Sequence, residues 1–141
     1  MQTRIAKDFI WEMSHRLTFH KGPCKNIHGH SYKLRVEVEG NLNSNSMILD
    51  YYDLESIVRP LLNQLDHAFL CDKNDDLMIN FLATNGFKHY IMDDFTTAEN
   101  MVDMFIQKFK PEFEKFQNIE SMMIRVYETF DVYAEKRISL K

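Results

Sequence analysis

The sequence predicts an α+β domain in which helices pack on one face of an antiparallel sheet. The stretch Lys33–Glu39 alternates apolar and charged residues, which is the period-2 pattern of a half-buried strand. Two later stretches, at about 53–65 and 98–109, repeat apolar residues at helical spacing instead. Strand patterns near both ends of the chain therefore flank a helical middle.

The first half of the chain begins with two predicted strands. The first is expected over Arg4–Met13, where Ile5, Phe9 and Trp11 stand among charged neighbours. A turn-rich stretch that contains Lys21-Gly22-Pro23-Cys24 separates it from the strand at 33–39. Residues 40–46 consist mostly of turn formers and are expected to be a loop.

The middle of the chain is expected to be helical. The first helix covers about Asp53–Leu65, and Pro60 should kink it or mark an irregularity. A shorter helix is expected at 76–83 and a short extended piece at 88–92. Thr96-Thr97-Ala98-Glu99 fits a capping box, with Thr96 as the N-cap of the second long helix and Glu99 reaching back.

Two strands close the chain, at about Glu120–Glu128 and Asp131–Ile138. The short Thr129-Phe130 connection predicts a hairpin between them. No repeat and no Pro/Gly/Ser-rich linker divides the sequence. We therefore expect residues 1–141 to form a single domain.

Composition excludes several classes of protein. The 141 residues are 45% hydrophobic and 13% aromatic, unlike a disordered chain. The net charge is −4 and no block of Lys and Arg stands out, so neither nucleic acid nor a membrane surface is an expected partner. No apolar run suits a signal peptide or a bilayer span, and two cysteines make no disulfide framework, so a cytoplasmic location is expected.

Three histidines form a candidate metal site. His28 and His30 flank Gly29 just before a predicted strand, so both imidazoles can face one ion while Gly29 lets the backbone approach it. His15, at the end of the first strand, could lie alongside them. Three histidines without a fourth protein ligand are typical of a catalytic zinc site. A lone His-x-His is a weak signal, but the cupin alternative lacks its glutamate, because Leu34 and Arg35 occupy the expected positions.

Four further residues are candidates for chemistry, each with a plain structural alternative. Cys24 lies four residues before His28, where a dication would favour its thiolate, or where it could be a fourth, site-closing ligand. Asp66 could orient His67 as an acid or base, although a histidine also suits a helix C-terminus. Glu128 could accept two parallel N–H bonds from an amidine-like edge, or be a solvated strand end.

Taken together, these motifs resemble the 6-pyruvoyltetrahydropterin synthase family, in family order and over nearly the whole chain. They are Trp11-Glu12-Met13-Ser14-His15-Arg16-Leu17, Cys24-Lys25-Asn26-Ile27-His28-Gly29-His30-Ser31-Tyr32, Met47-Ile48-Leu49-Asp50-Tyr51, Leu65-Asp66-His67, Thr97-Ala98-Glu99-Asn100 and Val126-Tyr127-Glu128-Thr129.

The resemblance implies a tunnelling fold (T-fold). Four-stranded antiparallel sheets of several subunits would pair into a β-barrel, giving a homo-oligomer, a hexamer or tetramer, with active sites between subunits. It implies Zn²⁺ on three ligands, proton transfer by one cysteine with an Asp-His pair from a neighbouring chain, and a glutamate that anchors the pterin ring. By this resemblance the zinc ligands are His15, His28 and His30, and the proton-transfer residues are Cys24, Asp66 and His67. Glu128 anchors the pterin ring, and Thr97 is expected to line the pterin pocket.

Within the family, the spacing before the His-Gly-His motif discriminates between activities. Only three residues separate Cys24 from His28, a form that resembles the 6-carboxytetrahydropterin synthases of queuosine biosynthesis. The implied reaction converts 7,8-dihydroneopterin triphosphate to 6-carboxy-5,6,7,8-tetrahydropterin, acetaldehyde and triphosphate. The alternatives are a pyruvoyl-forming synthase and a pterin-binding protein without turnover. Thr96 departs from the usual proline, and the segment 72–95 is longer than in the shortest members.

Overall fold

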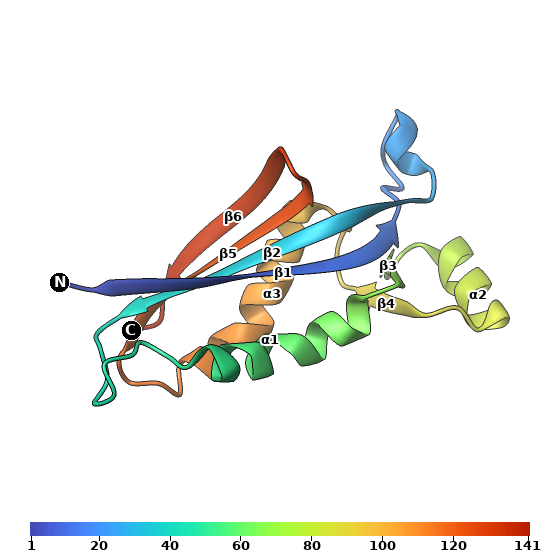
Figure 1. The fold of residues 1–141 in the computed structure, drawn as a ribbon. Coiled ribbons are helices and arrows are strands. Elements are labelled where there is room, and N and C mark those ends of the chain that lie inside the picture. Colours follow the sequence, from blue (N-terminus) through green and yellow to red (C-terminus); the bar gives the residue numbers. More distant parts are fainter.

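The computed structural model describes all residues from Met1 to Lys141. Its elements are β1 (Thr3–His15), the 3-10 turn η1 (Pro23–Lys25), β2 (His28–Gly40), α1 (Tyr51–Leu65), β3 (Ala68–Asp72), α2 (Asp76–Asn85), β4 (His89–Met92), α3 (Ala98–Phe113), β5 (Ile119–Thr129) and β6 (Val132–Ser139). The strands form one twisted sheet in the order β4-β3-β1-β2-β5-β6 (Figure 1).

The α+β class is confirmed, but the expected four-stranded antiparallel sheet is too small. Strands β1, β2, β5 and β6 are the four predicted strands and pair antiparallel. Two short strands extend the sheet in parallel, β3 beside β1 and β4 beside β3. The five residues of β3 are all buried, so they lack the polar alternation that identifies a half-buried strand.

Helices α1 and α3 cover one face of the sheet, and α2 lies beside β3 and β4 at one end (Figure 1). In the core beneath this face, Trp11 of β1 stacks on Tyr32 of β2 with ring centroids 5.2 Å apart. Phe105 of α3 meets the Trp11 ring edge-on at 5.8 Å. Aromatic packing between the sheet and α3 therefore lies directly beneath the ends of β1 and β2.

The structure differs from the sequence predictions at Pro60 in α1 and at the N-cap of α3. Helix α1 continues through Pro60 without interruption, so the expected irregularity does not end the helix. The N-cap of α3 is Thr97, whose hydroxyl accepts a hydrogen bond from the N–H of Asn100 at 3.2 Å. The capping box that placed Thr96 at this position is wrong, because the Thr96 hydroxyl donates to the carbonyl of Arg16 instead.

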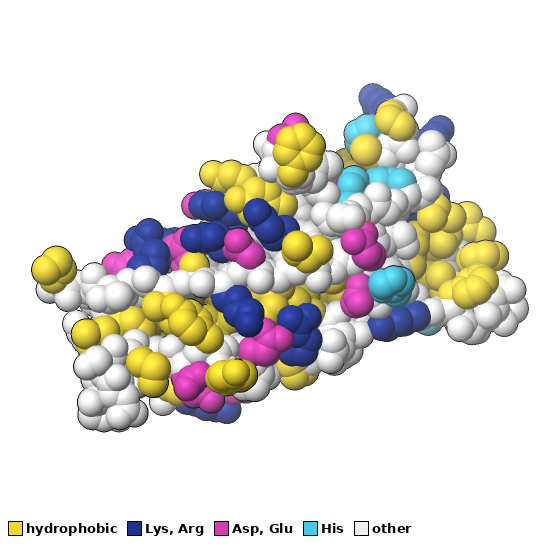
Figure 2. Space-filling view, in the orientation of Figure 1, with side chains coloured by type: hydrophobic (Ala, Val, Ile, Leu, Met, Phe, Trp, Pro, Cys, Tyr) yellow, Lys and Arg dark blue, Asp and Glu magenta, His cyan; other side chains and the backbone are white.

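The other face of the sheet carries interleaved charges along β1 and β2 (Figure 2). At its centre Glu37 is only 6% exposed and accepts hydrogen bonds from Arg35 at 3.0 Å and Arg137 at 2.7 Å. Burial opposes ionisation of Glu37, but these guanidinium groups outweigh it and hold the pKa of the carboxyl below its usual value. This face is thus held together by ion pairs.

Three backbone edges have no strand partner within the chain, one of which is the outer edge of β4 at the end of the sheet. Strand β3 pairs with β1 only at Met13 and Ser14, which leaves the rest of that side of β1 open. Strand β6 is the last of the sheet, so its outer edge is open as well. None of the helices combines the length and the apolar character that crossing a bilayer requires.

Candidate metal centre and adjoining pocket

The three candidate histidines meet at the ends of β1 and β2. His15 lies directly opposite His28 in the antiparallel register, and His30 follows two residues along the same face. Their ring centroids are 4.6, 5.4 and 5.1 Å apart. One ring nitrogen of each lies within 4.8 Å of the other two. The structure therefore brings together all three residues that the sequence predicted as metal ligands.

Backbone carbonyls orient two of these rings. Nδ1 of His15 lies 2.8 Å from the carbonyl oxygen of Thr96, and Nδ1 of His28 lies 2.7 Å from that of Asn26. A ring that donates from Nδ1 presents its lone pair at Nε2. Nε2 of His15 and of His30 are buried and have no hydrogen-bond partner. These donor atoms fit a zinc ion, for which neutral imidazole nitrogens are suitable ligands.

The electrostatics of the cluster favour neutral rings. Burial lowers the pKa of His15 to about 4; the hydrogen bond to the Thr96 carbonyl opposes this shift, and the nearby His28 and His30 add to it. Burial and His28 also lower the pKa of His30. Metal ligation requires deprotonated nitrogens, so both rings are ready for it at neutral pH.

Gly29 lies close to the backbone of β1, whereas it was expected to let the backbone approach a metal ion. It lies between His28 and His30 on a strand, so its α-carbon hydrogens belong to the opposite face of the sheet. A β-carbon there would lie 3.2 Å from the carbonyl oxygen of Met13. The glycine therefore eases the approach of β2 to β1.

Cys24 lies in η1 and is half-buried with a free thiol. The cluster of possible ligands contains the three histidines and does not include this thiol. The arrangement is that of three nitrogen donors, which leaves a coordination position open. The part that Cys24 plays in proton transfer stays a prediction.

Asp66 and His67 form the expected pair at the end of α1. They are not part of the cluster of three histidines, but His67 and His30 line one cavity of about 390 Å³. Oδ1 of Asp66 lies 3.0 Å from Nδ1 of His67 and also accepts a hydrogen bond from the backbone N–H of Glu12. The Glu12 N–H and the His67 ring together lower the pKa of Asp66. His67 adopts a left-handed φ of 60°, and its side chain is 76% exposed. The ring is therefore available to something outside the chain.

Glu128 borders the metal cluster at the end of β5. Its Oε2 lies 3.8 Å from Nε2 of His30, and its side chain is 27% exposed. Burial and the carboxylate of Glu99 raise its pKa, and the nearby His28 ring and the backbone N–H of Ala98 offset this only in part. The alternative of a fully solvated strand end does not describe this carboxylate.

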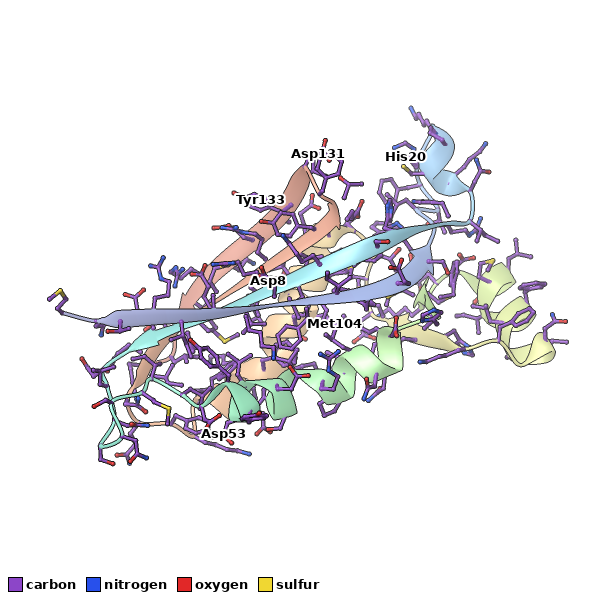
Figure 3. The ribbon with its side chains drawn as sticks, in the orientation of Figure 1. Asp8, His20, Asp53, Met104, Asp131 and Tyr133 are labelled. Atoms are coloured by element: carbon purple, nitrogen blue, oxygen red, sulfur yellow. The ribbon has the colours of Figure 1, made fainter.

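A cavity of about 530 Å³ joins Glu128 to His30, within the size range of small-molecule sites. Its other walls are formed by Ile10, Gly29, Ser31, Tyr32, Lys33, Tyr127, Thr129 and Phe130. Figure 3 labels Asp131 at the tip of the β5–β6 hairpin and His20 in the loop after β1. Thr97 does not line this cavity, and its hydroxyl caps α3.

Sequence reasoning missed two residues of this neighbourhood. Thr96 contributes its carbonyl to His15, a backbone contact between residues 81 positions apart that no local pattern reveals. Glu99 was expected to cap a helix, whereas it stands close enough to Glu128 to raise the pKa of that carboxyl. The one available signal was the position of Glu99 inside the Thr97-Ala98-Glu99-Asn100 motif.

Comparisons with known proteins agree on one family. The model of the family described as 6-pyruvoyl tetrahydropterin synthase matches residues 4–138. A 6-carboxy-5,6,7,8-tetrahydropterin synthase of Haemophilus influenzae is 32% identical over 140 residues, covering 94% of this chain and 96% of the relative. A putative enzyme of that name from Pyrococcus horikoshii is also 32% identical, over 100% of this chain and 96% of its own.

Solved structures agree on the fold. The 6-pyruvoyl tetrahydropterin synthase of Plasmodium falciparum superposes with a TM-score of 0.79 at 15% identity, covering 98% of each chain. An uncharacterized Wolinella succinogenes protein, WS1659, superposes with a TM-score of 0.82 at 17% identity, over 96% of this chain and 98% of its own. At these identities the likeness concerns the fold alone.

Proposed function

The chain belongs to the 6-pyruvoyl tetrahydropterin synthase family, and on that premise we propose that it is a zinc-dependent 6-carboxy-5,6,7,8-tetrahydropterin synthase. Its substrate would be 7,8-dihydroneopterin triphosphate, and its products 6-carboxytetrahydropterin, acetaldehyde and triphosphate. The observation that supports this best is the convergence of three histidine nitrogens beside Glu128. Two nearly full-length relatives with this enzyme's name support the choice within the family.

His15, His28 and His30 would hold the zinc ion through their ring nitrogens. When bound, zinc supplies Lewis acidity toward oxygen atoms of the substrate's side chain. The carbonyls of Thr96 and Asn26 keep two of the rings in the tautomer that ligation requires. These contacts prepare the ligands in advance, so that little reorganisation is needed when the ion binds.

Glu128 would anchor the pterin ring. Its carboxylate can accept two parallel N–H bonds from the aminopyrimidinone edge of a pterin. Because Oε2 lies 3.8 Å from Nε2 of His30, a ring held there would place its side chain beside the metal ligands. A direct role for Thr97 in pterin binding stays a prediction; it precedes Ala98 and Glu99, which line a second cavity together with Glu128.

Proton transfer would involve Cys24 and the Asp66–His67 pair. The Cys24 thiolate would move a proton on one side of the substrate's side chain. Asp66 engages Nδ1 of His67, which leaves Nε2 of that ring as the opposite acid or base. The ring is exposed at the surface, which supports its donation to the site of a neighbouring subunit.

A homo-oligomer, either a hexamer or a tetramer, is part of this proposal. The open sides of β1 and β6 present unpaired backbone groups, and such edges are templates for pairing with another chain. Pairing β1 of one subunit with β6 of the next would continue the sheet into a barrel. A cytoplasmic location and a place in queuosine biosynthesis complete the proposal.

The deciding experiment is to incubate the zinc-loaded protein with 7,8-dihydroneopterin triphosphate and identify the products by mass spectrometry. Carboxytetrahydropterin together with acetaldehyde is the expected result. A pyruvoyl product would keep the site but contradict the interpretation of the Cys24–His28 spacing. Zinc binding without turnover would refute the enzyme proposal and favour a pterin-binding protein.

A further inference from the structure

Thr96 touches the end of β1 at two successive residues, and we propose that it is a positioning residue for His15. We propose further that the ion pair between Arg16 and Asp75 fixes Thr96 in turn. The result is a chain of contacts from α2 to a ligand of the candidate metal centre. It depends on the hydroxyl of Thr96.

The first contact is between the Thr96 carbonyl and the His15 ring. The carbonyl oxygen lies 2.8 Å from Nδ1, and both residues are 1% exposed. Water therefore does not compete for this hydrogen bond, which determines both the tautomer and the rotation of the ring. Turning the carbonyl away would leave two buried polar groups without partners.

The second contact ties the Thr96 side chain to the backbone. Its hydroxyl donates to the carbonyl oxygen of Arg16 at 3.2 Å. One residue thus engages the His15 ring with its main chain and the adjacent peptide with its side chain. These two bonds together fix the orientation of the Thr96 carbonyl relative to β1.

The third contact holds Arg16 itself. Its guanidinium donates from Nε and Nη2 to the two oxygens of Asp75, at 2.7 and 2.6 Å. The Asp75 side chain is 3% exposed and also accepts a hydrogen bond from the N–H of Met78 at the start of α2. A buried two-pronged ion pair is geometrically specific, so Arg16 has little freedom to shift.

His15 needs such support more than the other two ligands do. Strand β1 ends at His15, whereas His30 lies inside β2 with strand on both sides. The His28 ring is held by the Asn26 carbonyl, two residues away in the same segment. Of these two ring–carbonyl hydrogen bonds, the one to His15 comes from a residue that is distant in the sequence.

This inference rests on the proposed metal centre and not on the proposed reaction. Its readout is therefore the zinc affinity of the whole protein, measured by competition with a chromophoric chelator. The visible spectrum of the Co²⁺-substituted protein reports ligand geometry independently. If the wild-type protein takes up neither ion, the metal centre itself is refuted, and this inference falls with it.

The test variant is Thr96→Val, which removes the hydroxyl at nearly constant volume. We expect zinc affinity to fall about tenfold, at the low end of the effect of losing an outer-shell contact, with a changed Co²⁺ spectrum. Thr96→Ser keeps the hydroxyl and should retain the zinc affinity and the Co²⁺ spectrum of the wild type. Ser14→Ala is the matched control, because it removes another hydroxyl beside His15, one that donates to the Ala68 carbonyl at 3.5 Å.

Wild-type zinc affinity and an unchanged Co²⁺ spectrum in Thr96→Val would overturn the proposal, as would an equal loss in Ser14→Ala. Asp75→Asn weakens the ion pair with Arg16 and so tests the same chain of contacts at its α2 end. This variant also provides the test if Thr96→Val does not fold. It should weaken zinc binding, and combining it with Thr96→Val should add less than the sum of the two losses. Strict additivity would show that the ion pair does not act through Thr96.

Discussion

Replacing Glu128 with glutamine tests the pterin anchor most directly. The substitution keeps the size of the side chain but removes its charge and turns one acceptor into a donor. A pterin edge that presents two N–H groups would then meet an N–H group. Both hydrogen bonds of the proposed pair are weakened at once.

The structure sets the expected magnitude. A hydrogen bond to a charged group contributes about 1.5–3 kcal/mol, and the 27% exposure of Glu128 favours the lower value because solvent screens the charge. Two such bonds give about 3 kcal/mol, which corresponds to roughly a hundredfold increase in Kd. Calorimetric titration of the zinc-loaded protein with an unreactive pterin, such as 6-methylpterin, measures this change.

The pH dependence of binding sharpens the test. Burial and Glu99 raise the pKa of Glu128 above 4.5, and only the ionised carboxylate accepts both N–H bonds. In the zinc-free protein, pterin affinity should therefore decline as the pH is lowered, beginning above the range of an ordinary glutamate. This measurement is made without zinc because a nearby dication would itself lower the pKa of Glu128. Glu99→Gln removes a repelling charge and should move this decline to lower pH. Unchanged pterin binding in Glu128→Gln would refute the anchoring role, and no shift in Glu99→Gln would show that Glu99 does not raise the pKa of Glu128.

Three further outcomes are expected. Metal analysis should find about one zinc per chain in the wild type and in Cys24→Ala but none in His15→Ala; zinc loss in Cys24→Ala would instead make Cys24 a ligand. Glu37→Gln should lower the free energy of unfolding at pH 7 by about 1–3 kcal/mol in urea titrations at fixed protein concentration. The fold lowers the pKa of Glu37, so this carboxylate stabilises the protein fully above pH 4.5, and the stabilisation is lost as the pH falls through the pKa of the folded state. A difference in unfolding free energy between wild type and Glu37→Gln that persists in acid would contradict this. Light scattering should give a multimer, and a monomer would exclude a site shared between subunits.

Local patterns in the sequence predicted most of the sheet and both long helices. The alternation of Lys33–Glu39 predicted the central strand, because one of its faces is buried and the other is charged. The same rule failed at β3, where all five residues are buried and no alternation exists. The parallel pairing of β3 with β1 joins segments more than fifty residues apart, and short-range periodicity contains no information about it.

The candidate site shows the same division. His28 and His30 share a strand, so their common direction follows from the backbone alone. Whether His15 would join them depended on the register between β1 and β2, which the structure supplies as a direct His15–His28 pair. The outer contacts of Thr96 and Asp75 join distant parts of the chain, and the raised pKa of Glu128 depends on burial and on Glu99, so none of these was predicted.

The register of β2 has a consequence for how this chain can change during evolution. His28 and His30 have the same parity as Tyr32, Leu34, Val36 and Val38, so the metal ligands and the core side chains of this strand occupy one face. Deleting a single residue between His30 and Leu34 would put the metal ligands and the core side chains on opposite faces of the strand. Changes of length should therefore accumulate in connecting segments such as 41–47, while the spacing between ligands and core stays constant across the descendants of this sequence.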